Sequence, residues 1–204
     1  RCVTNQVVVV AIPIPGCTDS LALNYDPLAT VDDSSCTYQM TYVPDDGFES
    51  LCEYWGWGDG IMNDSVYTHL ISQQNILSID GDHYTPLNDL TGIEDFISLT
   101  ELYISEANIS YLDVNNSTLL ILLVQDCPLL SSLSFGQLNN LFQLHVQNCS
   151  MDSLIVNDMP SLLYFSCDHN VNLTYLQVSN LSNIDEVSTT ANGDTLSTIH
   201  YDFN

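Results

Sequence analysis

Positive charge is almost absent from this sequence. Its 204 residues carry 26 acidic side chains but a single lysine or arginine, Arg1, so the formal net charge is −25. Nucleic acids and anionic membranes are bound through lysine and arginine side chains that meet phosphate groups, so this composition excludes both kinds of partner. It favours solubility and the attraction of cations instead.

Long apolar segments and catalytic motifs are also missing. The best candidate for a membrane span, residues 7–14, has eight residues and contains Pro13, whereas a membrane helix needs roughly 20 apolar residues. There is no nucleophile elbow, phosphate-binding loop or dinucleotide motif. We therefore expect neither membrane insertion nor enzymatic activity. The chain does not begin with Met, which we interpret as a mature or excised portion of a longer protein.

What the sequence does contain is a repeat. Apolar residues recur at steps of 20 to 23 positions along two ladders that run out of phase. The first ladder consists of Ile79, Leu102, Leu122, Leu144, Phe165 and Val187, and the second of Leu90, Leu112, Leu133, Leu154, Leu176 and Ile199. A period of about 21–22 residues is typical of leucine-rich repeats, in which stacked turns bury a continuous core.

Each period holds two strand-like segments, which predicts a mainly β solenoid. In Leu99–Ile104 the pattern L-x-x-L-x-L places Leu102 and Ile104 inward, and the return segments carry similar inward pairs such as Leu112 and Val114. We expect about five to six turns over residues 76–204. Residues 41–75 are predicted to form a small α N-terminal cap, with a helix that begins near Asp45 and a second short helix over residues 66–71.

Residues 16–40 form a separate module bracketed by two cysteines. A core this small needs a covalent link, so we predict a disulfide between Cys17 and Cys36. Five oxygen-bearing side chains make the module a candidate Ca²⁺ site: Asp19, Asn24, Asp26, Asp32 and Asp33. Hard oxygen ligands in an acidic chain suit Ca²⁺ better than a transition metal. The alternative is that these residues form turns.

Two segments resemble known secreted proteins. The residues Gly-Cys-Thr-Asp at 16–19, Asn-Tyr at 24–25 and Asp-Asp-Ser-Ser-Cys at 32–36 resemble cysteine modules of large secreted proteins from marine Bacteroidetes, which usually have glycine where this chain has Ser34. The residues Val-Pro-Asp-Asp-Gly-Phe-Glu at 43–49 and Asp-Leu-Thr-Gly-Ile-Glu-Asp-Phe at 89–96 are similar to the start of flavobacterial leucine-rich-repeat domains and to internalin caps. The resemblance implies a surface protein.

The cysteines and glycosylation motifs agree with that location. Seven cysteines fit an oxidising, extracellular or cell-surface compartment. Short Asp-Ser/Thr-aliphatic triplets begin at Asp19, Asp64, Asp152 and Asp194 and resemble the O-glycosylation motif of Bacteroidetes, so we expect a glycoprotein. Cys127 and Cys149 align with Asn170 and Asn192 and are predicted to be buried thiols at tight turns, with an inter-repeat disulfide as the alternative. Cys167 is predicted to be a core thiol. Whether Cys2 and Cys52 form a disulfide is left open.

Outward positions of the predicted strands define a candidate binding face with an apolar and aromatic centre and a polar rim. Its residues are Tyr103, Ile121, Leu123, Gln143, His145 and Tyr164. This composition suits a protein or glycan partner.

The first 15 residues are predicted to be an extended β-strand tail. Its β-branched run consists of Val7, Val8, Val9, Val10 and Ile12. The last turn, around Ile199 and Tyr201, shows no evident capping helix, and an uncovered solenoid end exposes strand edges. We therefore expect an extracellular adhesion or assembly module, a homo-oligomer or filament in which the tail of one subunit covers the open end of the next. The alternatives are a monomeric receptor for a ligand, glycan or surface protein, and an accessory domain of a larger secreted enzyme.

Overall fold

The computed structural model describes residues 12–81, 86–116, 118–190 and 192, together with the backbone of residues 198–202. By its internal contacts the chain divides into two compact units, residues 1–39 and 40–204. Among the described residues, no helix combines the length and the apolar character that a membrane crossing requires.

The first unit is held together chiefly by its disulfide. Two short strands, β1 (Pro15–Gly16) and β2 (Val31–Asp32), pair in parallel. Cys17 and Cys36 are bonded with an S–S distance of 2.12 Å, which confirms the predicted pair. Among the described residues of this unit, only Cys17 and Ala22 belong to the buried apolar set. Because so little apolar surface is buried, the covalent link contributes most of the restraint.

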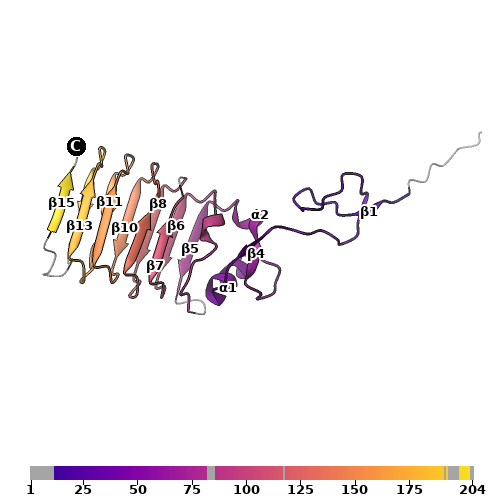
Figure 1. Ribbon diagram of the computed structural model, residues 1–204, viewed down its shortest axis with the longest axis horizontal. Coiled ribbons are helices and arrows are strands. Elements are labelled where there is room, and N and C mark those ends of the chain that lie inside the picture. The colour runs from indigo at the N-terminus through magenta and orange to yellow at the C-terminus, as the bar shows by residue number, and fades with distance from the viewer. Residues whose placement is uncertain (1–11, 82–85, 117, 191, 193–197, 203–204) are drawn as a thin grey trace, which may run out of the picture. The chain divides into compact units, whose positions relative to one another are not determined.

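The second unit is mainly a β-solenoid of about five turns. One side of each turn adds a strand to a six-stranded parallel sheet, seen in Figure 1. In spatial order this sheet contains β14 (Glu186–Ser188), β12 (Tyr164–Ser166), β10 (Gln143–Gln147), β8 (Ile121–Gln125), β6 (Glu101–Ser105) and β5 (Ile76–Asp80).

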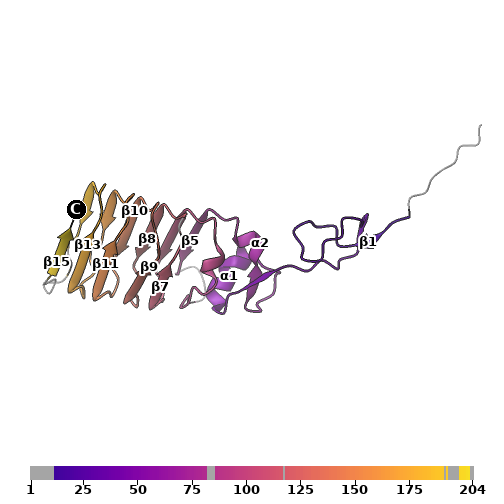
Figure 2. The same ribbon diagram turned by 45° about the horizontal axis from the view of Figure 1, so that its top comes forward.

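The other side of each turn contributes a return strand. The return strands form two smaller parallel sheets, and Figure 2 shows the strands of both sides stacked along the solenoid. One sheet contains β7 (Tyr111–Val114) and β9 (Ser132–Phe135), and the other contains β11 (Ser153–Asn157), β13 (Tyr175–Ser179) and β15 (Thr198–Asp202).

Side chains along each strand point alternately inward and outward, and the inward ones build the core. Leu102, Leu122 and Leu144 are neighbours in register and are each at most 1% exposed. The first ladder predicted that Ile79 is the equivalent of Leu102, and this alignment was wrong. Leu77 pairs with Leu102, whereas Ile79 pairs with Ile104. The connection between β5 and β6 is longer than later ones and includes the 3₁₀ helix η1 (Ile93–Asp95).

Burial along the return strands differs from the prediction at one point. Most of the predicted inward pairs are buried, but Leu133 and Phe135 of β9 are only partly buried against the core. Leu90 is buried although it lies in no strand. The inward pattern therefore holds for the solenoid as a whole but weakens at β9.

The turns that follow the strands, here called the corners, repeatedly use a left-handed backbone. Such a residue follows both the sheet strands and the return strands: Glu106, Asp126, Asn148, Asp158, His169 and Asn180, with φ between 50° and 59°. Asn and Asp tolerate this conformation better than other non-glycine residues. The polar residues at these positions therefore set where each strand ends.

In three successive turns the residue after the sheet-side corner is buried and its side chain bonds to the backbone. The Cys127 and Cys149 thiols donate to the carbonyls of Gln125 and Gln147, at 3.3 and 3.2 Å. Asn170 occupies the equivalent place in the next turn. Its Oδ1 accepts from the Cys149 N–H at 3.0 Å, and its Nδ2 donates to the Val146 carbonyl at 2.7 Å and to the Asp168 carbonyl at 3.3 Å.

A helical segment precedes the first solenoid strand. It consists of β3 (Met40–Tyr42), α1 (Asp46–Tyr54), β4 (Ser65–Tyr67) and α2 (Thr68–Ile71). The Asp45 side chain caps α1 by accepting from the Phe48 N–H at 3.0 Å, as its position predicted. The second helix is shorter than expected, because Val66 lies in β4 and pairs antiparallel with Thr41. Phe48 and other apolar side chains of this segment share one core with the solenoid.

We expect the Asn170→Ala substitution to lower the free energy of unfolding by about 3 kcal/mol, because the buried backbone loses the acceptor of the Cys149 N–H and a donor to the Val146 carbonyl. Chemical denaturation followed by circular dichroism measures this change. The matched control is Asn183→Ala, because Asn183 is exposed and donates once, to Pro160. The control should cost less than about 1 kcal/mol, and equal losses would contradict the role assigned to Asn170.

Candidate binding surface

The parallel register brings the six predicted binding residues together. One row across the sheet runs Glu101, Ile121, Gln143 and Tyr164, and the adjacent row runs Tyr103, Leu123, His145 and Ser166. These two rows are here called the paired-row face. The side chains between them point into the core, so the face is built by the outward half of each strand. Whether the face binds a partner stays a prediction.

The side chains of the paired-row face support one another. Ile121, Leu123 and Tyr164 are each half-buried. The Tyr164 ring lies edge-on to Phe142, with the ring centroids 5.2 Å apart. Side chains held in this way lose little conformational freedom on binding, which favours affinity.

Polar contacts fix the orientation of three further residues on the face. The Tyr103 hydroxyl donates to Glu101 Oε2 at 2.7 Å, and this bond, together with burial and the carboxylate charge, raises the pKa of Tyr103. Gln143 Nε2 and His145 Nε2 are 2.7 Å apart. Burial lowers the pKa of His145, against the opposing charges of Asp168 and Glu186. His145 is therefore mainly neutral at pH 7, which leaves it as a hydrogen-bonding group.

Strand alternation would place Ser166 and Asp168 on the exposed side with Tyr164, but they are only 5% and 9% exposed. Asp168 accepts hydrogen bonds from the hydroxyls of Ser166 and Ser188 and from Thr190. Burial alone would raise the pKa of Asp168, but these bonds outweigh it and lower the pKa. A carboxylate saturated in this way is a poor general base, so its role is to join β12 to the following turn.

A hollow of about 210 Å³ opens beside this network. Its lining includes Gln143, His145, Tyr164, Ser166 and Glu186. The hollow combines an aromatic wall with amide, imidazole and carboxylate groups. It can accept a side chain or a small polar group of a partner.

The predicted Ca²⁺ ligands of the Cys-bracketed module lie at turns. In four of them one carboxylate oxygen accepts the N–H two residues ahead, at 2.9 to 3.1 Å: Asp19, Asp26, Asp32 and Asp33. Asn24 instead binds the backbone on both sides of Cys36, accepting from the Thr37 N–H and donating to the Ser35 carbonyl. This arrangement fits the turn alternative, and Ca²⁺ in this module stays a prediction.

The remaining cysteines are buried thiols where the structure describes them. Cys52, Cys127, Cys149 and Cys167 are all free, so the inter-repeat disulfide is not formed. Burial raises the pKa of Cys52 and of Cys167 to about 12, so these thiols are protonated and unreactive at neutral pH. Cys2 lies outside the described residues.

The predicted assembly residues are only partly described. Val7, Val8, Val9 and Val10 lie outside the described residues, and Ile12 is 83% exposed. In the backbone of β15, Ile199 pairs with Leu176 and Tyr201 with Val178. The side chains of Ile199 and Tyr201 lie outside the described part of the chain.

Sequence reasoning missed one group of side chains. Within the described ranges, three acidic residues in the helical segment come close enough to share a cation: Asp46, Glu49 and Asp64. The spacing of Asp46 and Glu49 on a helix was readable, because residues i and i+3 share a face. The approach of Asp64 depends on the fold.

Comparisons with known proteins assign no family to the chain. No family model matches it, and no curated protein is significantly similar to it.

We expect stability to fall in acid because Asp168 must be protonated. Its pKa is below the ordinary value of 3.8 in the folded protein, so its contribution is present above that value and is lost as the pH falls through the folded pKa. Asp168→Asn should be less stable at neutral pH and should lack this part of the acid-dependent loss. Thermal unfolding measured between about pH 7 and pH 2 tests this. Asp113→Asn on β7 is the control, and an acid profile of Asp168→Asn that matches wild type would contradict the assignment.

Proposed function

We propose that this protein is a secreted, non-enzymatic adhesion module that binds another protein through the paired-row face. The observation that carries the proposal is the register that aligns Tyr103, Leu123 and His145 in one row, beside a second row that contains Ile121 and Tyr164. Protein-binding patches typically have such an apolar and aromatic centre within a polar rim. The net charge of −25 favours a partner with a basic surface.

A leucine-rich-repeat identity fits the solenoid. Its support is the repeat period, the buried leucine rows, and the buried Cys or Asn that follows three successive sheet-side corners, at Cys127, Cys149 and Asn170. In this proposal the helical segment is the N-terminal cap, which shields the first turn from water. The resemblance to surface proteins of Bacteroidetes points the same way.

An extracellular or cell-surface location is supported by the disulfide. The Cys17–Cys36 bond holds a unit that buries little apolar surface. Such bonds persist in oxidising compartments. The strongly acidic composition suits solubility in a salt-rich exterior.

The binding proposal predicts that Leu123→Glu weakens binding by at least about tenfold, because it places a charge in the apolar centre of the face. Surface plasmon resonance against a panel of immobilised extracellular proteins and glycans measures this. Tyr164→Ala should act in the same direction.

The matched control is Ile155→Glu, because Ile155 lies on the return strand β11 and is 49% exposed. The proposal is supported if the Ile155→Glu variant still binds the partner and the Leu123→Glu variant does not. Equal effects of the two substitutions contradict it, and binding to glycans alone would replace the protein partner by a carbohydrate.

Self-assembly is a second candidate, favoured by the strand order. Within the described residues, β14 pairs only with β12, and β15 pairs only with β13. An edge strand offers backbone N–H and C=O groups to an added strand. The β-branched run at residues 7–12 has the composition of such a strand.

Deletion of residues 1–11 should leave a folded monomer, whereas the full chain should associate at high concentration. Light scattering after size-exclusion chromatography measures the mass of each. Replacement of Val7–Val10 by serine is a control of unchanged length and should also be monomeric. Polymers formed by the truncated chain, or a full chain that stays monomeric, would rule this candidate out.

A further inference from the structure

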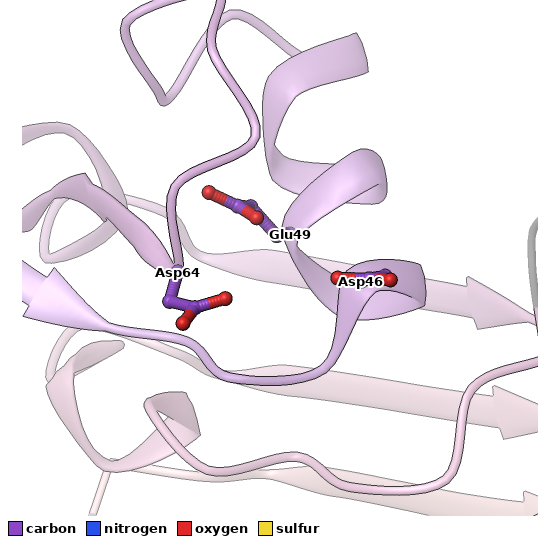
Figure 3. A group of neighbouring side chains, drawn as sticks. All are labelled: Asp46, Glu49 and Asp64. Atoms are coloured by element: carbon purple, nitrogen blue, oxygen red, sulfur yellow. The ribbon is translucent and has the colours of Figure 1, made fainter.

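Three carboxylates converge beside helix α1 (Figure 3). Asp46 lies in the first turn of α1 and Glu49 one turn later on the same side. Asp64 lies in the loop that leads into β4. One oxygen from each residue lies within 4.8 Å of the others. Like charges this close repel one another unless a cation or a proton is shared between them.

The buried carboxylate of Glu49 is the observation that points to a bound ligand in this cluster. Its side chain is 0% exposed. One oxygen, Oε1, accepts from the backbone N–H groups of Asn63 and Ser65, at 2.7 and 3.1 Å. The other oxygen, Oε2, is buried without a hydrogen-bond partner. A buried carboxylate oxygen without a partner is costly, and a bound cation removes that cost.

The loop that carries Asp64 is pinned on both sides of this residue. The two backbone N–H groups that donate to Glu49 belong to Asn63 and Ser65, the residues on either side of Asp64. The Asp64 carbonyl accepts from the Val43 N–H at 2.9 Å. Asp64 itself has a left-handed backbone, with φ of 61°. The Glu49 side chain and the backbone of the Asp64 loop are thus positioned by contacts that do not depend on the cation.

Among the described residues there is no lysine or arginine to neutralise the cluster. The chain has no lysine, and its one arginine, Arg1, lies outside the described residues. We infer that Asp46, Glu49 and Asp64 bind a Ca²⁺ ion. An all-oxygen ligand set disfavours transition metals, and Ca²⁺ tolerates irregular geometry better than Mg²⁺. Asp46 and Asp64 are exposed, so water can complete the coordination. The ion would tie the loop before β4 to α1.

The two tryptophans of the chain allow a luminescence test of this site. Trp55 and Trp57 directly follow α1, and Trp57 packs edge-on against Phe96 with ring centroids 5.7 Å apart. The full chain, freed of metal with a chelator, is titrated with Tb³⁺, an ion that replaces Ca²⁺ at oxygen sites. Terbium luminescence excited through tryptophan should rise to saturation, and added Ca²⁺ should reverse it.

Removing one charged ligand should weaken binding by at least about tenfold. Asp46→Asn, Glu49→Gln and Asp64→Asn are the test variants, and asparagine also accepts the left-handed backbone at position 64. The matched control is Glu53→Gln on the same helix, because Glu53 already accepts from the N–H groups of Asp59 and Gly60. It should titrate like the wild type.

Three results would overturn the inference. One is a wild-type chain without a saturable signal, and another is a wild-type titration curve in all three test variants. The third is a terbium luminescence signal that is lost in Asp32→Asn but retained in all three test variants. That result would place the ion in the Cys-bracketed module. If Glu49→Gln does not fold, judged by circular dichroism, the exposed Asp46 and Asp64 variants still decide the question.

Discussion

Parallel pairing in register is the interaction on which the solenoid depends. In such a ladder each position stands beside its equivalent in the next turn, so Leu102, Leu122 and Leu144 form one continuous buried row. A slip of one residue would turn this row toward solvent. The corners oppose the slip, because a left-handed residue follows the strands, and after three sheet-side corners a buried Cys or Asn side chain also bonds to the backbone. Asn170 does this most completely, since it bonds to backbone groups of its own turn and of the turn before.

The scarcity of basic side chains governs how this protein satisfies its carboxylates. Without lysine, an aspartate or glutamate depends on backbone N–H groups, side-chain amide or hydroxyl groups, or an external cation. Asp26 and Asp32 use the backbone at turns. Asp168 uses the hydroxyls of serine and threonine side chains on the solenoid. Glu49 uses the backbone for only one of its oxygens, and the burial of the other oxygen without a hydrogen-bond partner sets it apart from these aspartates.

Much of the fold was predictable from the sequence because a solenoid repeats its local rules. The spacing of Leu122 and Leu144 predicted paired strands, and the residue alternation predicted the side chains of the paired-row face. The register at Ile79 was wrong, because a connection of irregular length carries no periodic signal. The burial of Asp168 was missed because its donors come from a later turn. The position of Asp64 beside α1 was not predictable, since a loop and a helix meet there only through tertiary structure.

The stacked turns also determine how the solenoid would respond to tension. Each turn pairs with its immediate neighbours, and corner side chains such as Asn148 and Asp126, or Asn180 and Asp158, bond across successive turns. Force applied along the stacking direction would load these small interfaces in series rather than all at once. The weakest interface would open first, releasing a length of about 21 residues, while the remaining turns kept their structure. Such a protein would lengthen in steps under load instead of failing in a single event.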